Sequence, residues 1–563
     1  MGTRHFAFWP SYAGRTVTLP ETSLWLNLQV SARRFPNKTA ISFYESLLSY
    51  AGFEREAEAL AGYLQKVCGV KRGDRVGLYL QNSPQFIIGF YAILRADAVV
   101  VPINPMNVAG ELAYVAGDSG AKVIVVAQDR FAEVAPLLAD GTFAHAVVAT
   151  YADYLVRATD LSIPDFVRAP RAWPETAGAV AWTDALASGH APAPPTAGAD
   201  DLSVMPYTSG TTGHPKGCMH THRTVMQTAL AKVVWQSMTA QDVVLTVLPL
   251  FHVTGMQNTM NAPIYAGATM IVMARWDREV AADLIARHRV TSLNAVPTMV
   301  VDLLSSPTIE QRDLRSLMFV SGGGAAMPEA VATKLQELCK LTYLEGYGLS
   351  ETMAATHVSP VDRPKKQCLG IPSFGVDARV VDPEALERHV PGAAIAEQPV
   401  DETGEILVHG PQVFLGYWNK PEANEACFVD IEGKRFFRTG DLARVDEDGY
   451  FFMVDRLKRM INASGFKVWP AEVESMLYAH PAIREAAVIA RRDPRRGETV
   501  KAVVVLREDQ RDAVDEEALI AWARTQMAAY KVPRSIAFVD ALPKSGSGKI
   551  LWRVLQEAED QQT

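Results

Sequence analysis

Residues 207–217, YTSGTTGHPKG, gather three glycines, five hydroxyl side chains and one lysine into a stretch with little to bury. Glycine lets the backbone turn tightly and bring its N–H groups close to a ligand, and the serine and threonine hydroxyls add further donors. Placed between a strand and a helix, such a loop also borrows the helix amino terminus. The pattern therefore predicts a loop that cradles phosphate oxygens, with an ordinary solvent-exposed turn as the alternative.

Two familiar nucleotide-binding motifs do not fit this chain. The P-loop pattern GxxxxGK[ST] fails at Lys216, which Gly217 follows, and at Lys549, where the glycine required six positions earlier is Pro543. No GxGxxG follows a strand-like segment, and SGGGAAM at 321–327 lacks the third glycine of a Rossmann site. The loop at 207–217 therefore needs another explanation than an ordinary P-loop NTPase or a dinucleotide enzyme.

Further motifs follow this loop along the chain. They are EGYGLSE (345–351), GEILVHG (404–410), GYW (416–418), FRTGDLARVDEDGYFFMVDRLKRMI (437–461), SGFKVWPAEVE (464–474) and LPKSGSGKI (542–550). In this order, and over about residues 20–555, the set resembles the ANL superfamily of adenylate-forming enzymes. The overall resemblance is closest to bacterial medium- and long-chain fatty acyl-CoA synthetases.

Periodicity in the sequence predicts an α/β protein. Apolar residues recur at helical spacing over 54–67, and β-branched runs alternate with helical patterns at 75–80, 99–103, 122–127, 243–248 and 269–274. Such alternation is typical of parallel sheets with crossover helices, and 563 residues are too many for one core.

The resemblance implies two domains. The first, residues 1–457, is a large N-terminal domain that binds AMP and the acyl group; it consists of stacked, mostly parallel sheets with helices plus a small β-barrel-like part. The second, residues 458–563, is a small mobile α+β C-terminal lid with its hinge near Lys458. Both ranges are expectations at this stage.

Composition narrows the function further. A formal net charge of −8 argues against general nucleic-acid binding. The five cysteines show no metal-type spacing, so we expect free thiols in a reducing compartment. The longest apolar run, 86–94, is far shorter than the ~20 residues of a membrane-spanning helix. We therefore expect no transmembrane segment and, without a secretory signal, a cytoplasmic location.

The reaction implied by the resemblance is that of an ATP-dependent acid:CoA ligase. A carboxylate attacks the α-phosphate of ATP to give acyl-AMP and pyrophosphate, and the acyl group then passes to the thiol of coenzyme A with release of AMP. Only fourteen residues follow Lys549, which leaves no room for a fused carrier protein and makes CoA the expected acceptor. An aryl-CoA ligase of the 4-coumarate or benzoate type, luciferase chemistry and a noncatalytic acyl or nucleotide sensor stay open.

The resemblance also assigns roles to individual residues. Lys549 bridges the carboxylate and the α-phosphate, Glu351 holds Mg²⁺ on the phosphates, and His252 lies beside the acyl carboxylate. Residues implied in ATP or AMP binding are Thr208, Ser209, Gly210, Thr211, Thr212, Gly213, Lys216, Gly323, Gly324, Ala325, Gly346, Tyr347, Gly348, Ser350, Asp441 and Arg456. Lys458 is the hinge, and the residues implied in CoA binding are Gly465, Phe466 and Lys467.

The acyl pocket is expected around Trp235, Val253, Met256 and Val296. The segments implied to line it, 252–256, 294–297 and 322–327 together with Trp235, are mostly apolar and show no obvious cation for a dicarboxylate or an amino acid. A medium- or long-chain fatty acid is therefore the expected substrate, with ATP and CoA as the other small-molecule partners. A homodimer is one assembly left open.

Overall fold

The computed structural model describes residues 3–208, 214–323, 327, 329–463, 466–493, 497–510, 514–544 and 550–561. Packing divides the chain into two compact units. The large unit comprises His5–Asp377 and His409–Ala426, and the carboxy-terminal unit comprises Ala378–Val408 and Cys427–Thr563 with the amino-terminal residues up to Arg4. Because packing does not report motion, the predicted boundary between residues 1–457 and 458–563 stays a prediction.

The first sheet of the large unit has nine strands among the described residues and carries the predicted site. In spatial order the strands are β16 (Ile371–Pro372), β15 (Ala354–Val358), β14 (Tyr343–Leu349), β13 (Phe319–Gly323), β12 (Ser292–Asn294), β10 (Val243–Thr246), β11 (Thr269–Val272), β1 (Thr39–Phe43) and β2 (Ser46–Ser49). From β14 to β1 all neighbours are parallel. The carboxyl ends of β10, β12, β13 and β14 therefore meet at one edge, where open α/β sheets bind their ligands.

A second sheet of the large unit has seven strands in the described part of the chain. They are β7 (Ala179–Ala181), β6 (His145–Ala149), β5 (Val123–Ala127), β3 (Arg75–Tyr79), β4 (Val99–Pro102), β8 (Leu202–Val204) and β9 (His220–Thr221). The five strand-like runs predicted from β-branched residues coincide with β3, β4, β5, β10 and β11 and are confirmed.

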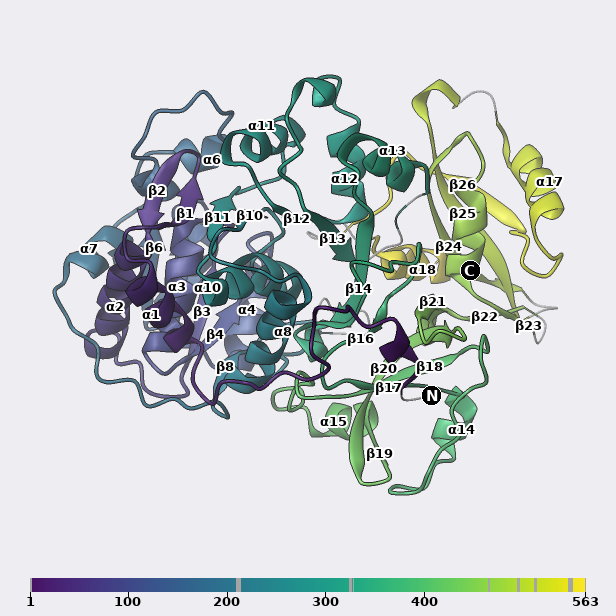
Figure 1. The fold of residues 1–563 in the computed structure, drawn as a ribbon, viewed down its shortest axis with the longest axis horizontal. Coiled ribbons are helices and arrows are strands. Elements are labelled where there is room, and N and C mark those ends of the chain that lie inside the picture. The colour runs from purple at the N-terminus through teal and green to yellow at the C-terminus, as the bar shows by residue number, and fades with distance from the viewer. Residues whose placement is uncertain are drawn as a thin grey trace. The chain divides into compact units, whose positions relative to one another are not determined.

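Helices surround and separate these sheets (Figure 1). Every residue of α3 (Pro84–Arg95) is buried, as expected for a helix that is apolar on most of its circumference. The predicted helix at 54–67 is α2 (Tyr50–Lys66), whose first turn is capped by the Ser49 hydroxyl. The other α-helices described in this unit are α1 (Trp25–Arg34), α4 (Ala109–Ser119), α5 (Phe131–Ala139), α6 (Asp165–Arg168), α7 (Trp182–Ala187), α8 (His222–Trp235), α9 (Val253–Met256), α10 (Ala262–Ala266), α11 (Arg278–His288), α12 (Pro297–Leu304), α13 (Glu329–Cys339) and α15 (Pro421–Cys427).

The carboxy-terminal unit is α+β. Its first sheet consists of β17 (Asp377–Val381), β18 (Gly404–His409), β20 (Lys434–Val445), β19 (Phe428–Ile431) and β21 (Phe451–Arg456). Its second consists of β23 (Phe466–Val468), β22 (Ile461–Ala463), β25 (Gly497–Leu506), β24 (Ile483–Asp493) and β26 (Ser535–Phe538), with helices α14 (Pro383–Glu387), α16 (Pro470–Leu477), α17 (Glu516–Gln526) and α18 (Trp552–Asp560) in the unit. The predicted fold class, a large domain of parallel sheets and helices with a smaller α+β domain, is confirmed.

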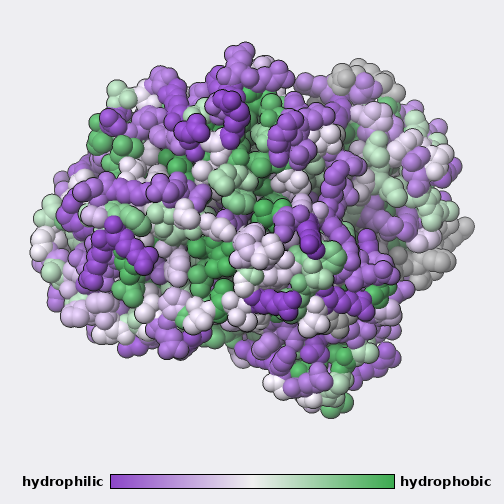
Figure 2. Space-filling view, in the orientation of Figure 1, coloured by the Kyte–Doolittle hydropathy of each residue, from purple (hydrophilic) through white to green (hydrophobic). Residues whose placement is uncertain are grey.

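Two further expectations concern the surface and the thiols. Hydrophilic side chains lie between smaller hydrophobic groups on the face shown in Figure 2. Among the residues described, no helix is both long and apolar enough to cross a bilayer. All five cysteines lie among the described residues, and no disulfide joins any of them, as predicted.

Candidate active site

The neck of the predicted phosphate loop is closed by its own backbone. Thr208 N–H donates to the carbonyl oxygen of Lys216 at 3.0 Å, and Lys216 N–H donates to Thr208 Oγ1 at 3.2 Å. Tyr207 and Gly217 continue the pairing as an antiparallel bridge. The loop leaves β8 and returns through β9 into the amino terminus of α8, so it lies between a strand and a helix as predicted.

Lys216 and Glu351 both contact Tyr417. The Lys216 ammonium lies 4.4 Å from the ring centroid, and the Tyr417 hydroxyl donates to Glu351 Oε1 at 2.7 Å. Glu351 lies in the 3₁₀ turn Ser350–Thr352 that follows β14, at the carboxyl edge of the nine-stranded sheet. The structure thus brings together two predicted site residues, a cation suited to phosphate and a carboxylate suited to a metal ion, through a tyrosine that had no predicted role.

His220 supports the backbone next to Glu351. Its Nε2–H donates to the carbonyl oxygen of Ser350 at 2.8 Å. The imidazole is buried, and burial lowers its pKa to about 4, so it is neutral near pH 7. A neutral imidazole adds a hydrogen bond here without adding a positive charge beside the Glu351 carboxylate.

The GYW motif at 416–418 braces the phosphate loop through backbone pairing. Met219 N–H donates to the Gly416 carbonyl at 3.0 Å, and Trp418 N–H donates to the Gly217 carbonyl at 2.8 Å. On its other side the segment reaches the end of β14, because Phe414 N–H donates to the Glu351 carbonyl at 2.9 Å. The motif therefore ties the loop's second arm to the end of β14.

Asp118, near the end of α4, contacts both the first arm of the loop and the segment that contains the GYW motif. Its carboxylate accepts from the Tyr207 hydroxyl at 2.8 Å and pairs with the Lys420 ammonium at 2.7 Å. Its carbonyl oxygen accepts from the indole N–H of Trp418 at 3.1 Å. Burial and the neighbouring Asp118 carboxylate raise the pKa of Tyr207, so its hydroxyl stays protonated and keeps donating.

Glycines at the ends of β13 and β14 let the strands approach closely. A Cβ at Gly323 would lie 2.3 Å from the Gly346 carbonyl oxygen, and one at Gly348 would lie 1.8 Å from that of Ala354. Strand packing therefore requires both glycines. Tyr347 directly precedes Gly348 in β14 and is buried. The slot for adenine that these residues suggest stays a prediction.

The side predicted to bind the acyl group begins at α9. His252 caps this helix, since Thr254 N–H donates to its Nδ1 at 3.3 Å, and the histidine is exposed. Val253 and Met256 are buried, whereas Val296, which caps α12, is partly accessible. These residues follow β10 and β12, so they share the carboxyl edge with Glu351.

Trp235 forms part of an aromatic cluster with the amino-terminal segment. Its ring makes edge contacts with Trp9 at 4.9 Å and Phe374 at 5.7 Å between centroids. Its indole N–H donates to the Ser359 carbonyl at 3.1 Å, and its own carbonyl accepts from the Tyr12 hydroxyl at 2.6 Å. The aromatic neighbours and both hydrogen bonds hold Trp235 in place. Its contact with the acyl substrate stays a prediction.

Comparison with known proteins decides the family. Residues 28–418 match the AMP-binding enzyme family, and residues 472–549 match the AMP-binding enzyme C-terminal domain. The chain is 35% identical over 98% of its length to a long-chain-fatty-acid–CoA ligase of Bacillus subtilis, of which 97% is covered. It is also 35% identical to a feruloyl-CoA synthase of Amycolatopsis, with 92% of this chain and 96% of the relative covered.

The chain belongs to the AMP-binding enzyme family. Among solved structures, ATP-bound MatB from Rhodopseudomonas palustris superposes with a TM-score of 0.83 at 30% identity, over 97% of this chain and 100% of that one. The predicted ANL superfamily and enzyme class, an AMP-forming acyl-CoA synthetase, are confirmed.

In the carboxy-terminal unit of this AMP-binding enzyme, Asp441 and Arg456 form an ion pair. They are partners across β20 and β21, with Arg456 Nε 2.9 Å from Asp441 Oδ1. The aspartate side chain is only 1% exposed and the arginine 30%. The structure brings these two predicted ribose ligands together, and their contact with a nucleotide stays a prediction.

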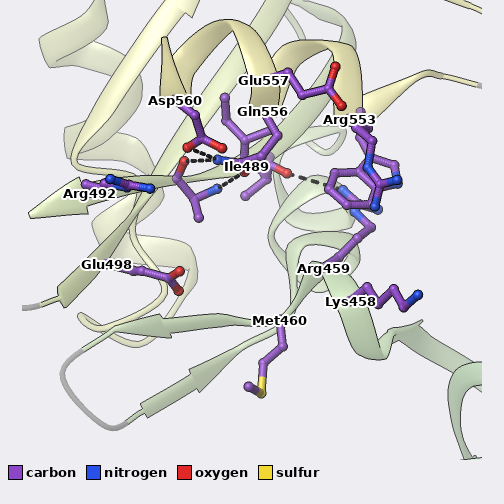
Figure 3. A pocket seen from close by; sticks show the side chains of 13 residues that line it. Lys458, Arg459, Met460, Ile489, Arg492, Glu498, Arg553, Gln556, Glu557 and Asp560 are labelled. Carbon is purple, nitrogen blue, oxygen red and sulfur yellow. Dashed lines mark hydrogen bonds between the residues drawn. The ribbon is translucent and has the colours of Figure 1, made fainter. Parts of the chain in front are cut away.

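Lys458, the predicted hinge, lies in a short 3₁₀ turn, Leu457–Arg459, and is exposed. It borders a pocket of about 340 Å³ within the carboxy-terminal unit (Figure 3). On one wall Gln556 of α18 exchanges hydrogen bonds of 2.9 Å with the backbone of Ala490. Arg492 and Glu498 also line this pocket, so charges of both signs surround it.

Several predicted residues lie outside the described part of the chain. These are Ser209, Gly210, Thr211, Thr212, Gly213, Gly324, Ala325, Gly465 and Lys549. The backbone of Phe466 and Lys467 belongs to β23, which pairs with β22. Sequence reasoning assigned no role to Tyr417, His220 or Asp118, although Tyr417 stands in the GYW motif and His220 lies three residues after the glycine-rich loop.

Proposed function

We propose that this acyl-CoA synthetase activates a medium- or long-chain fatty acid with MgATP and transfers the acyl group to CoA. The AMP-forming acid:CoA ligase reaction follows from the family. The proposal adds the identity of the acid, the use of Mg²⁺ and the roles of individual residues. It also includes a cytoplasmic location, and it leaves a homodimer open.

The observation that best supports these residue roles is that Lys216 and Glu351 both contact Tyr417. A polyphosphate bound in the loop after Thr208 needs a cation from the protein and a metal ion held by a carboxylate. Lys216 leaves the neck of that loop, and Glu351 stands at the end of β14, joined to it by one ring. This pair therefore supports ATP binding at the carboxyl edge of the nine-stranded sheet.

The donor set fits Mg²⁺ better than a metal held by protein alone. Among the described residues, no group of three His, Cys, Asp or Glu side chains could hold an ion. Mg²⁺ is usually bound by one or two carboxylates together with phosphates and waters. Glu351 would supply that carboxylate, and the bound ion would neutralise charge on the phosphates.

The chain's own residues then divide the work. Lys216 and the loop grip the β- and γ-phosphates, Asp441 accepts hydrogen bonds from the ribose hydroxyls, and His252 lies beside the acid carboxylate. Lys549 carries the positive charge that brings the carboxylate oxygen and the α-phosphate together. Movement about Lys458 withdraws Lys549 before the CoA thiol enters.

The class of acid substrate is inferred from the side chains at the predicted acyl pocket and from the names of the relatives. Val253 and Met256 present a buried apolar surface beside His252, which suits an aliphatic body. One relative's name specifies a long-chain fatty acid and another's a feruloyl group. An aryl-CoA ligase is therefore the second candidate.

A panel of acids tests this proposal. The protein is mixed with MgATP, CoA and acids from butyrate to palmitate, together with benzoate and coumarate, and AMP release is followed. We expect the highest kcat/KM for aliphatic acids of medium or long chain. Preference for coumarate would favour the aryl ligase, and no acid-dependent AMP with any member would favour a noncatalytic sensor.

A further inference from the structure

Lys232 places a cation on the acyl side of the site. It lies on α8, one turn before Trp235, and its ammonium donates to Asn294 Oδ1 at 3.1 Å. Ser321 Oγ lies 3.5 Å from the same nitrogen. Because Asn294 ends β12 and Ser321 belongs to β13, the ammonium reaches the edge of the sheet where the acyl pocket was predicted. A cation therefore contacts Asn294, a residue of the segment 294–297 that was predicted to line the acyl pocket.

The surroundings of this lysine leave its charge uncompensated. Both hydrogen-bond partners are neutral, and no carboxylate among the described residues lies within ion-pair distance of Lys232. Residue 232 as a whole is partly accessible to solvent, whereas its ammonium is desolvated. Burial lowers its pKa to about 7. A desolvated ammonium without a counter-ion costs free energy, so a structural role alone explains it poorly.

The two polar neighbours do not need the lysine. The Ser321 hydroxyl donates to Asn294 Oδ1 at 2.9 Å, and the Asn294 amide lies 3.4 Å from Ser292 Oγ. Asn294 and Ser321 thus satisfy each other while the ammonium, with three protons, adds a second donor to the same oxygen. An ammonium that is desolvated and not needed by its own hydrogen-bond network is suited to a ligand oxygen.

We propose that Lys232 is a specificity-determining residue that recognises an oxygen acceptor on the acyl body of the acid, a carboxylate in preference to a hydroxyl. The inference rests on the proposed function, because it places the acyl body along α8 and the ends of β12 and β13. It narrows the substrate class from plain fatty acids to acids that carry a second oxygen function. A carboxylate is preferred because it supplies both the hydrogen bond and the missing negative charge.

Matched acids test the inference. For each chain length from hexanoate to hexadecanoate, kcat/KM is measured for the plain acid, the ω-hydroxy acid and the α,ω-dicarboxylic acid, and cinnamate is compared with coumarate. At the best length we expect the dicarboxylic acid to exceed the plain acid, with the hydroxy acid between them. In Lys232→Met the ratio should fall roughly tenfold to a hundredfold.

Two control variants keep the result interpretable. Lys232→Arg retains the charge and should retain part of the preference. Lys38→Met removes another half-buried lysine of lowered pKa, which donates to Thr269 Oγ1 at 2.8 Å at the amino end of β11, away from the carboxyl edge. That variant should leave every ratio unchanged. Lys232→Met should fold, because it removes a desolvated charge, and it should match or exceed the wild type on plain acids.

Each outcome is decisive. Equal ratios in the wild type and Lys232→Met, or no oxygenated acid preferred by the wild type at any length, would overturn the inference while leaving an active ligase of plain acids. Failure of the proposed function is distinct, since then no acid of either kind would release AMP. Calorimetric titration of the dicarboxylic acids adds a second readout, and the loss of affinity in Lys232→Met should match the loss in kcat/KM.

Discussion

The phosphate side and the acyl side of the site treat charge in opposite ways. On the phosphate side Lys216 and Glu351 are joined through Tyr417 within the protein. On the acyl side Lys232 has neutral partners, Asn294 and Ser321, among the described residues. Both sides lie along the carboxyl edge of one sheet, so the difference comes from the side chains and not from the fold.

This comparison separates rate from selectivity. In the proposed function the phosphate side binds ATP, which is the same for every acid, so substitutions there should change the rates with all acids by one factor. The acyl side meets the part of the substrate that varies, so substitutions there should change the order of preference among acids.

The largest effect is expected for Lys549→Ala. Acid-dependent exchange of pyrophosphate into ATP should fall by about a hundredfold or more for every acid, because the charge that joins carboxylate and phosphate is lost. Thiolation of a supplied acyl-adenylate should be largely retained. Lys544→Ala is the matched control. Lys544 belongs to the same segment, 542–550, as Lys549, but its ammonium is paired with Glu485 at 2.8 Å. Equal loss in both half-reactions would contradict the assigned role.

Glu351→Gln comes next. We expect kcat/KM for MgATP to fall roughly tenfold to a hundredfold and the Mg²⁺ dependence to move to higher concentration, because the neutral amide is a weaker ligand for the ion. The factor should be the same for plain and oxygenated acids. Glu310→Gln, at an exposed glutamate of the same unit, serves as the control. A loss that varies with the acid would break the separation between the two sides.

The sequence points to candidate residues more directly on the phosphate side than on the acyl side, for a physical reason. The loop at 207–217 and the motif that contains Glu351 gather their glycines, hydroxyls and charges within a few residues. The bond between Tyr417 and Glu351 spans 66 residues, and that between Lys232 and Asn294 spans 62, so both depend on packing. A lysine in the helical run ALAKVVW looks like a solvent-facing residue until the strands that cover it are known.

The fold shows the same distinction. The strands β3, β4, β5, β10 and β11 were predictable because buried parallel strands are runs of β-branched residues. Gly323 and Gly348 were named from the sequence as candidate nucleotide-binding residues. Their close contacts with neighbouring strands were not predicted, because such contacts depend on strand order.

A smaller effect is expected for Tyr417→Phe. The variant loses the hydrogen bond to Glu351 but keeps the ring beneath Lys216, so KM for MgATP should rise about threefold to tenfold with kcat nearly unchanged. Tyr417→Leu, which also removes the ring, should raise it further. An unchanged KM in both variants would show that the tyrosine does not position either charged group.

The smallest effect on catalysis is expected for Glu345→Gln, which tests a second buried ionisable group. Glu345 is buried and accepts from Met327 N–H at 2.9 Å, and burial raises the pKa of its carboxyl to about 7. Between about pH 4.5 and 7 the folded protein retains a proton that the unfolded chain has released, so the carboxyl lowers stability as pH rises. Glutamine cannot ionise. Across this pH window the free energy of unfolding of the variant should therefore rise, relative to that of the wild type, by on the order of 3 kcal/mol.

Thermal unfolding measures this gain. The unfolding midpoint of Glu345→Gln minus that of the wild type should be larger at pH 8 than at pH 4.5, with the order of preference among acids unchanged. The same difference at both pH values would mean that the carboxyl titrates normally in the folded protein.

Exchange of labelled pyrophosphate into ATP in the absence of CoA tests the central claim most directly, because it reports adenylate formation alone. We predict exchange that requires an acid, that is strongly reduced in Glu351→Gln, and that gives way to AMP and acyl-CoA in equal amounts when CoA is added. Protein that binds MgATP yet shows no exchange with any acid, or that releases AMP without one, would contradict the account.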